Sequence, residues 1–314
     1  MRKQRLYRSS ISVFIVLLTA IGAHSQSKNG ASATAVMWER VNIGQRDLFW
    51  GAGGRAGQPD LRKITLVRKE TGGNNLKYRI KDGSGRTWVA KIADESQPEV
   101  AANRLLHGVG YKTEIDYLVP ELVIPGKGQF RNVRLEARPD NVERLGRWSW
   151  KNNPFVDTNE FQGLKIMMAL VNNWDIKDGN NAILEKGGRH YYVVSDMGSS
   201  FGKLAPIGLP FLNRFGRSVN RPEHFHRSEF IKGIEKDGDL DFAYKAKAKG
   251  MYDHISPDEG RWMANLLNQL SEKQIHDAFR AAGYGAEDAT ILARAIQGRI
   301  RALDTTTTLY GMLR

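Results

Sequence analysis

Two short polar segments hold the residues best suited to chemistry. Asp175 and Asn180 bound the first segment, which also contains Lys177, and Asp196 follows an apolar stretch sixteen residues after Asn180. An Asp can orient or deprotonate an acceptor hydroxyl, and a neighbouring Lys can neutralise a transferring phosphate. Asn and Asp side chains supply the oxygen ligands that Mg²⁺ prefers. In this order, these residue types are typical of phosphoryl transfer.

A helix must come before the first segment. Apolar residues recur at helical spacing over 161–171, so we expect a helix that ends near Asn172 and leaves Asp175 in the following loop. Asp157 and Glu160 have the spacing of a capping box, which we expect at the start of this helix.

A hairpin should connect the two segments. Residues 181–184 and 190–194 are apolar, aromatic or β-branched, and 185–189 contain two adjacent glycines. This pattern predicts two strands joined by a turn. The hairpin would bring Asn180 and Asp196 to the same end, within reach of one divalent cation.

Each motif alone is also explained by loop formation, since Asp, Gly and Asn are common turn residues. The order of elements favours chemistry instead. Three predicted strands, over 64–68, 76–80 and 87–92, precede a short helix over 98–107 and then the long helix and the hairpin. Further strands are expected at 117–125 and 133–137, and three helices are expected after Ser256.

The residues from Asn172 to Asn180, together with Asp196-Met-Gly198, resemble the catalytic and metal loops of the protein-kinase-like superfamily. They are more similar to its atypical branches: the toxin kinases of bacterial persistence, the phosphoinositide-type kinases and the secretory-pathway kinases. Those proteins have Asn before the catalytic Asp, where typical kinases have His-Arg. The chain as a whole also resembles a group of exported bacterial proteins.

The resemblance implies an α+β, two-lobed fold with a small antiparallel β N-lobe over 61–140 and a mainly helical C-lobe over 141–314. It implies ATP or another nucleotide as a cofactor, with Mg²⁺ or Mn²⁺. Asp175 and Lys177 would then be catalytic, and Asn180 and Asp196 would bind the metal. The segment 201–220 follows Asp196 where such proteins have their activation segment.

Nucleotide contacts are expected from the N-lobe. Val89-Ala-Lys91 resembles the strand whose Lys binds the α and β phosphates. Gly72 and Gly73 lie between the first two strands and can present backbone N–H groups to an anion. Glu99 is the candidate partner that orients Lys91. Glu99 is expected in the first turn of its helix. The helix dipole favours a negative charge there, which explains this position equally well.

Residues 1–25 have the pattern of a signal peptide. Four basic residues precede a short apolar run and the small-x-small motif Ala23-His-Ser25, so we expect cleavage near Ser25-Gln26 and export to the periplasm or beyond. An uncleaved anchor is the alternative. No stable membrane span should remain after cleavage. Residues 26–60 are expected to form a linker and an N-terminal extension, and the chain contains no Cys.

The formal net charge of +13 suits anionic partners. No nucleic-acid fold signature is visible, so no specific nucleic-acid binding is expected. The predicted function is ATP- and Mg²⁺-dependent phosphoryl transfer to an unknown hydroxyl acceptor, either a protein or an envelope component. Because ATP is scarce outside the bacterial cytoplasm, a catalytically silent binding module remains an alternative. Nucleotidyl transfer on the same fold is another.

Overall fold

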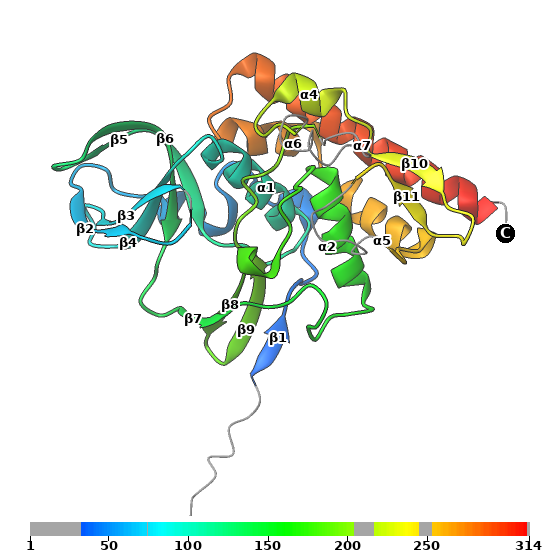
Figure 1. The fold of residues 1–314 in the computed structure, drawn as a ribbon, viewed down its shortest axis with the longest axis horizontal. Coiled ribbons are helices and arrows are strands. Elements are labelled where there is room, and N and C mark those ends of the chain that lie inside the picture. Colours follow the sequence, from blue (N-terminus) through cyan, green and yellow to red (C-terminus); the bar gives the residue numbers. More distant parts are fainter. Residues whose placement is uncertain (1–32, 74, 204–216, 245–252, 313–314) are drawn as a thin grey trace, which may run out of the picture. The chain divides into compact units, whose positions relative to one another are not determined.

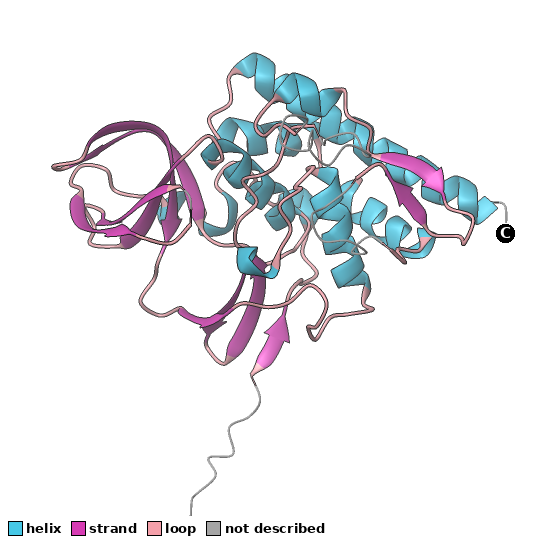
Figure 2. Cartoon of the chain, in the orientation of Figure 1, coloured by secondary structure: helices cyan, strands magenta, loops and turns pink. Residues whose placement is uncertain are grey.

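The computed structural model describes residues 33–73, 75–203, 217–244 and 253–312 of the chain. The predicted signal peptide, 1–25, lies outside these ranges, as do residues 204–216 of the predicted activation segment. Within them, the two larger sheets lie on one side of the ribbon and most helices on the other, where the small β10–β11 sheet also lies (Figure 1, Figure 2). None of the helices in the described ranges is both long and apolar enough to span a bilayer.

Five antiparallel strands form the N-lobe sheet, in the order β2-β3-β4-β6-β5. Their bounds are β2 (Thr65–Glu70), β3 (Leu76–Lys81), β4 (Thr87–Ile92), β5 (Asp116–Ile124) and β6 (Gly128–Ala137). Alternate residues point to opposite faces of a sheet. One face carries the buried side chains of Ile80, Trp88, Val133 and Leu135, which form the core of this lobe.

Helix α1 (Ser96–Gly108) connects β4 to β5 and carries Glu99 in its first turn. Its apolar residues, such as Val100 and Leu105, belong to the larger core that continues into the C-lobe. The helix therefore joins the sheet to the rest of the described chain, and the position of Glu99 depends on both lobes.

Helix α2 (Asn159–Leu170) leads to the loop with Asp175. The Thr158 hydroxyl caps it by accepting a hydrogen bond from the Phe161 N–H, at 3.2 Å. The predicted capping box of Asp157 and Glu160 is therefore wrong by one residue. Asp157 has a φ of 68°, a left-handed conformation, whereas the N-cap needs the extended backbone that Thr158 has.

A second sheet has the order β1-β9-β8-β7. Its strands are β1 (Thr34–Val36), β7 (Glu143–Gly146), β8 (Asn181–Lys186) and β9 (Arg189–Val194). The turn between β8 and β9 is Gly187-Gly188, with φ of 60° and 75°, values that favour glycine at both positions of a tight hairpin turn. The hairpin joins Asn180 to Ser195, whose N–H donates to the Asn180 carbonyl at 2.7 Å.

The remaining helices form the body of the C-lobe. They are α4 (Pro222–His226), α5 (Pro257–Leu267), α6 (Glu272–Ala281) and α7 (Ala286–Met312), with a small hairpin of β10 (Ile231–Ile234) and β11 (Leu240–Phe242). Capping boxes that begin at Ser256 and Ser271 start α5 and α6, as their sequences predict.

The segment before the N-lobe sheet packs against both lobes. Three short 3₁₀ turns occupy Ile43–Gln45, Gly51–Gly53 and Arg55–Gly57. Met37, Ile43 and Leu48 are buried in the larger core. The described part of this extension thus contributes to the folded body.

Candidate nucleotide and metal site

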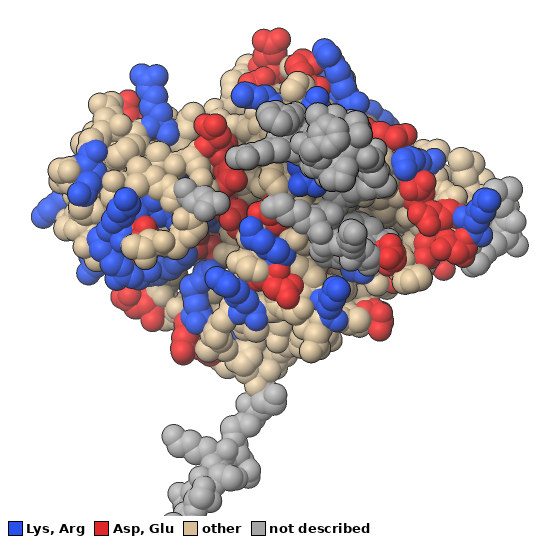
Figure 3. All heavy atoms as spheres, in the orientation of Figure 1, with Lys and Arg blue, Asp and Glu red and all other residues tan. Residues whose placement is uncertain are grey.

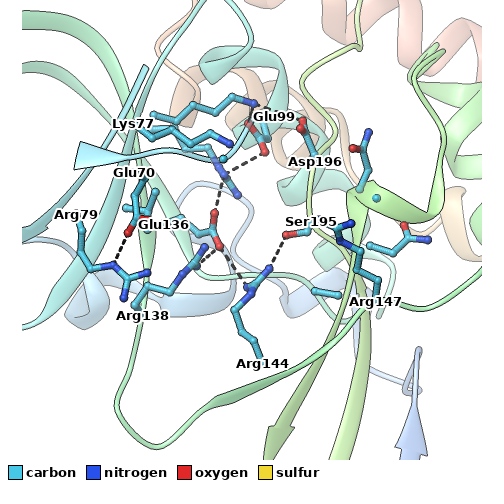
Figure 4. Close-up of a pocket in the computed structure, with 18 of the residues that line it drawn as sticks. Glu70, Lys77, Arg79, Glu99, Glu136, Arg138, Arg144, Arg147, Ser195 and Asp196 are labelled. Carbon is cyan, nitrogen blue, oxygen red and sulfur yellow. Dashed lines mark hydrogen bonds and ion pairs between the residues drawn. The ribbon is translucent and has the colours of Figure 1, made fainter. Parts of the chain in front are cut away.

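A pocket of about 420 Å³ lies where the N-lobe sheet meets the β8–β9 hairpin. Lys91 comes from β4, Glu99 from α1 and Arg134 from β6, while Asn180 and Asp196 flank the hairpin at its open end, where the Asp196 N–H donates to the Asn180 carbonyl at 3.2 Å. Figure 4 shows Glu99 and Asp196 among the side chains that line this pocket. The pocket brings together Lys91 and Asp196, two predicted residues that are 105 positions apart in sequence.

Lys91 is almost completely buried and lies among three carboxylates. Its Nζ atom is 2.8 Å from Glu99, 3.0 Å from Glu95 and 3.4 Å from Asp196. Burial lowers the pKa of Lys91, but these three carboxylates outweigh it and hold the pKa above its usual value. Lys91 is therefore a permanent cation that faces the pocket.

Glu99 is fully buried between two cations. Arg134 Nη1 is 3.0 Å from one of its oxygens, and Lys91 contacts the other. Burial raises the pKa of Glu99 to about 7, although Arg134 and Lys91 oppose the shift. Glu99 therefore contacts Lys91 in a position that fixes the orientation of the lysine side chain. The carboxylate is close to titration near neutral pH.

Glu95 is a partner of Lys91 that the sequence interpretation did not include. It lies immediately before α1, four residues after Lys91, and it also accepts a hydrogen bond from Asn75 at 2.6 Å. A Cβ atom on Gly198 would lie 2.5 Å from the Glu95 Cβ. This close approach explains why glycine follows Asp196-Met197. In the sequence, the four-residue separation between Lys91 and Glu95 was the feature that could have indicated this pairing.

The loop from Asp175 to Asn180 is folded tightly on itself. Lys177 Nζ lies 2.6 Å from an Asp175 carboxylate oxygen, and the Asn180 amide donates to the Asp175 carbonyl at 2.7 Å. The Asp178 carboxylate accepts from the Trp150 N–H at 3.0 Å. Asp175 and Lys177 are not among the described residues that line the pocket. They lie on the same loop as Asn180, which does line it.

Asn180 and Asp196 carry oxygen donors of the kind that a divalent cation binds. The Asn180 amide nitrogen is engaged, so its oxygen is the atom left for a ligand. The Asp196 side chain is 39% exposed and lines the pocket. The described residues contain no cluster of three His, Cys, Asp or Glu side chains suited to a metal. A Mg²⁺ ion shared with phosphates needs only one or two protein carboxylates, so two oxygen donors are adequate.

Only one of the two predicted loop glycines lines the pocket. Gly72 is part of its wall, whereas Gly73 is not among the described lining residues. Gly73 has a φ of 79°, so the turn between β2 and β3 favours glycine there for backbone reasons. Asn74, next to it, lies outside the described residues.

The inner wall of the pocket contains charged residues that the sequence interpretation missed. Arg134 and Glu136 point inward from β6, and Arg138 and Arg144 follow in the connection to β7 and in β7 itself. Apolar and charged residues alternate along β6, where Arg134 and Glu136 each follow a buried apolar residue, Val133 or Leu135. This alternation could have predicted the charged wall. Figure 4 shows Glu136 and Arg144 facing each other across this wall.

Basic side chains also gather outside the pocket. Figure 3 shows Lys and Arg side chains over the N-lobe sheet on this face. Lys77 and Arg147 line the pocket, and neither has an ion-pair partner among the described residues. An anionic ligand would meet cations before it enters the pocket.

No protein-family model matches the chain, and no curated protein matches its sequence. Some solved structures are similar to the chain. The Helicobacter pylori proinflammatory kinase CtkA matches with a TM-score of 0.49 and 11% identity, over 80% of this chain and 98% of that one. The Rio2 kinase of Chaetomium thermophilum matches with a TM-score of 0.30 and 12% identity, over 76% and 72%.

Another similar structure is the amicoumacin kinase hAmiN, with a TM-score of 0.28 and 11% identity, over 79% of this chain and 92% of that one. At these values the likeness concerns the fold and assigns no substrate. The described chain has the predicted two-lobed α+β architecture: an antiparallel sheet, with α1 between two of its strands in sequence, and then a helical lobe with a loop and hairpin.

Proposed function

We propose that this protein transfers a phosphoryl group from a nucleotide to a hydroxyl acceptor, with Mg²⁺ or Mn²⁺ as cofactor. One observation carries the proposal. The buried cation of Lys91 lies 2.8 Å from Glu99 and 3.4 Å from Asp196, in a pocket that Asn180 also lines. A fixed cation beside two oxygen donors is the arrangement that a metal-bound polyphosphate needs.

Each residue has a distinct role in this proposal. Lys91 binds the nucleotide phosphates, and Glu99 keeps it directed at them. Asn180 and Asp196 hold the metal, which neutralises charge on the transferring group. Asp175 orients the acceptor hydroxyl and takes its proton, and Lys177, 2.6 Å from Asp175, neutralises charge at the acceptor side.

A thermal-shift experiment tests binding first. Nucleotide plus Mg²⁺ should raise the melting temperature, because a ligand that binds only the native state stabilises it by about 2.7 kcal/mol at a hundred times Kd. Asp196→Asn should abolish the metal-dependent part of the shift. Asp241→Asn, at a residue of β11 that does not line the pocket, is the matched control and should retain it. An equal shift in both variants would remove Asp196 from the site.

Transfer is tested separately with labelled nucleotide and host envelope extract. Label from the terminal phosphate should appear on an acceptor with the wild type and be lost with Asp175→Asn. Incorporation of α-phosphate label would indicate nucleotidyl transfer instead. Metal-dependent binding without either product would leave a catalytically silent binding module.

Export belongs to the proposal as well. It rests on the basic start, the short apolar run and the Ala23-His-Ser25 motif. Mass spectrometry of the protein from its native host should find an N-terminus near Gln26. An intact Met1 on protein from the cytoplasm would contradict export and leave the chemistry untouched.

A further inference from the structure

The inner end of the pocket is charged rather than apolar. Of the described residues that line it, only Val89 and Ala182 are apolar and larger than glycine. Arg79, Arg138 and Arg144 also line it. Small-molecule sites are usually lined mainly by apolar side chains, with a few polar groups that fix orientation. A nucleotide base in this pocket would therefore be recognised chiefly through polar contacts.

The backbone beside this wall has few donors left for a base. The Ala137 N–H donates to the Ile115 carbonyl at 2.9 Å, and the Arg138 N–H donates to the Thr87 carbonyl at 2.8 Å. Pro139 has no N–H group. Where the chain leaves β6, hydrogen-bond donors to a base must therefore come from side chains.

These side chains present more donors than acceptors. An Arg side chain carries five N–H donors. Arg138 uses its Nη1 group on Glu136 and on the Ala137 carbonyl, and Arg79 uses its Nε on Glu70. The other guanidinium nitrogens of Arg138 and Arg79 have no acceptor among the described residues.

Two acceptors on this wall, Glu136 and Ser195, are already engaged. Glu136 receives Arg134 at 2.9 Å, Arg144 at 3.5 Å and Arg138. Ser195 donates to Glu114 at 2.5 Å and accepts from Arg144 at 3.0 Å. A ligand group that enters here must bring its own acceptors.

The wall does not need a further full negative charge. Arg134, Arg138 and Arg144 each already contact Glu114 or Glu136, two buried carboxyl groups. Burial opposes ionisation of Glu136, but Arg138 and Arg134 outweigh it and hold its pKa well below the usual value. A neutral group rich in acceptors suits this wall better than another phosphate or carboxylate.

We propose that this wall reads the base of the bound nucleotide and prefers a purine with a carbonyl oxygen at position 6 over adenine. Guanidinium donors pair with the O6 and N7 acceptors of such a base, a pairing that proteins use for guanine. Adenine has an amino group at position 6 instead. This group is a hydrogen-bond donor, and here it would face the guanidinium donors. This inference rests on the proposed function, because it concerns the nucleotide of the same site.

Three nucleotides decide the question with the wild-type protein. ATP, ITP and GTP are titrated calorimetrically, each with Mg²⁺. ITP carries a carbonyl oxygen where ATP carries an amino group and lacks the extra amino group of GTP. ITP and GTP should bind at least about fivefold more tightly than ATP, the lower end of the discrimination of a bidentate Arg contact. Equal affinity, or tighter binding of ATP, would overturn the preference.

Inorganic tripolyphosphate with Mg²⁺ tests whether the base is read at all. It should bind at least tenfold more weakly than ITP. If it binds as tightly as ITP, the arginines contribute nothing to base recognition and the proposal fails. Failure of every nucleotide to bind with Mg²⁺ would overturn the proposed function as well. A site that binds nucleotides but favours ATP overturns only the base preference.

Variants then locate the preference. Arg138→Leu should reduce the ITP-to-ATP affinity ratio to within about twofold, because it removes donors from the wall. Arg131→Leu is the matched control: it lies on the same strand, is exposed and does not line the pocket, so the ratio should be unchanged. If Arg138→Leu unfolds, Arg138→Lys is used instead, because it keeps the positive charge but loses the paired N–H donors of the guanidinium. The ITP-to-ATP affinity ratio should still fall in this variant. An unaltered ratio in a folded Arg138 variant would exclude this residue as the reader of the base.

Discussion

Arg134 donates to the Glu99 oxygen that Lys91 does not use. The Arg134 Nη1 atom is 3.0 Å from Oε1, and the Lys91 Nζ atom is 2.8 Å from Oε2. Arg134 also lies 3.0 Å from Asp116, which in turn binds Arg104 of α1 at 2.9 Å. Lys91 is therefore tied through two carboxylates to the sheet and to a second point on α1.

Replacement of Arg134 should be costly. Arg134→Met leaves Glu99, Asp116 and Glu136 buried with fewer partners, so the free energy of unfolding should fall by about 3–5 kcal/mol. Urea unfolding measures the loss. Arg131→Met, exposed on the same strand, should change stability by less than about 0.5 kcal/mol. Similar small losses in both variants would show that the buried network adds little.

The stability of the protein should fall as pH rises from about 4.5 to 7. Burial raises the pKa values of Glu99 and Glu114 to about 7 from an ordinary 4.5. The folded state then binds more protons than the unfolded state across this window, so the stabilisation is complete below pH 4.5 and is lost as pH rises through 7. The pKa of Glu136 is lowered, so its titration affects stability only below this pH window.

Melting temperatures measured across pH 4.5–8 test this dependence. Each kcal/mol should correspond to about 2–4 °C in a chain of this size. Glu99→Gln together with Glu114→Gln should flatten the curve, while Glu143→Gln, at an exposed position in β7, should leave its shape unchanged. A wild-type melting temperature that rises steadily over this range would contradict the raised pKa values.

The chemical step should depend on Asp175. Asp175→Asn keeps the shape and removes the base, so turnover should fall by about 10²–10⁴-fold while nucleotide affinity is retained. Lys91→Ala should weaken nucleotide binding and turnover together, because it removes a phosphate contact. Single-turnover kinetics and titration separate the two effects. A loss of nucleotide affinity in Asp175→Asn comparable with that of Lys91→Ala would refute this division of roles.

Arg299 of α7 should stabilise the end of α2 and, through it, the loop that carries Asp175. Its guanidinium is fully buried and donates to the Ala169 and Leu170 carbonyls at 3.2 and 3.0 Å, and to the Asn172 side chain at 2.9 Å. Arg299→Met should lower the free energy of unfolding by on the order of 3 kcal/mol, because it leaves buried acceptors without a donor.

Hydrogen exchange provides a second measurement for Arg299→Met. Protection should fall first at the end of α2 and in the loop before Asp175. Arg294→Met, on an exposed part of the same helix, is the control and should leave protection unchanged. A uniform loss of protection in Arg299→Met would indicate general destabilisation without a specific effect on the loop.

Local signals predicted the elements well and the inner wall poorly. Period-two and helical patterns located β2 to β5 and α2 to within two residues, because each depends on near neighbours in sequence. The fifth N-lobe strand, β6, begins at Gly128, five residues before its expected start. The N-cap shifted from Asp157 to Thr158, since capping depends on backbone angles that composition does not reveal. The network of Glu114, Arg134 and Arg144 joins three separate strands or connections, and no spacing rule relates them.

The support of the loop by Arg299 has a consequence for biosynthesis. Asn172 and Arg299 are separated by 127 residues, and ribosomes add about 5–20 residues per second. The loop that carries Asp175 is therefore made about 6–25 s before the side chain that holds its supporting helix end in place. During that interval the growing chain contains all the proposed catalytic residues but lacks their anchor, so competence for chemistry comes only with the last helix.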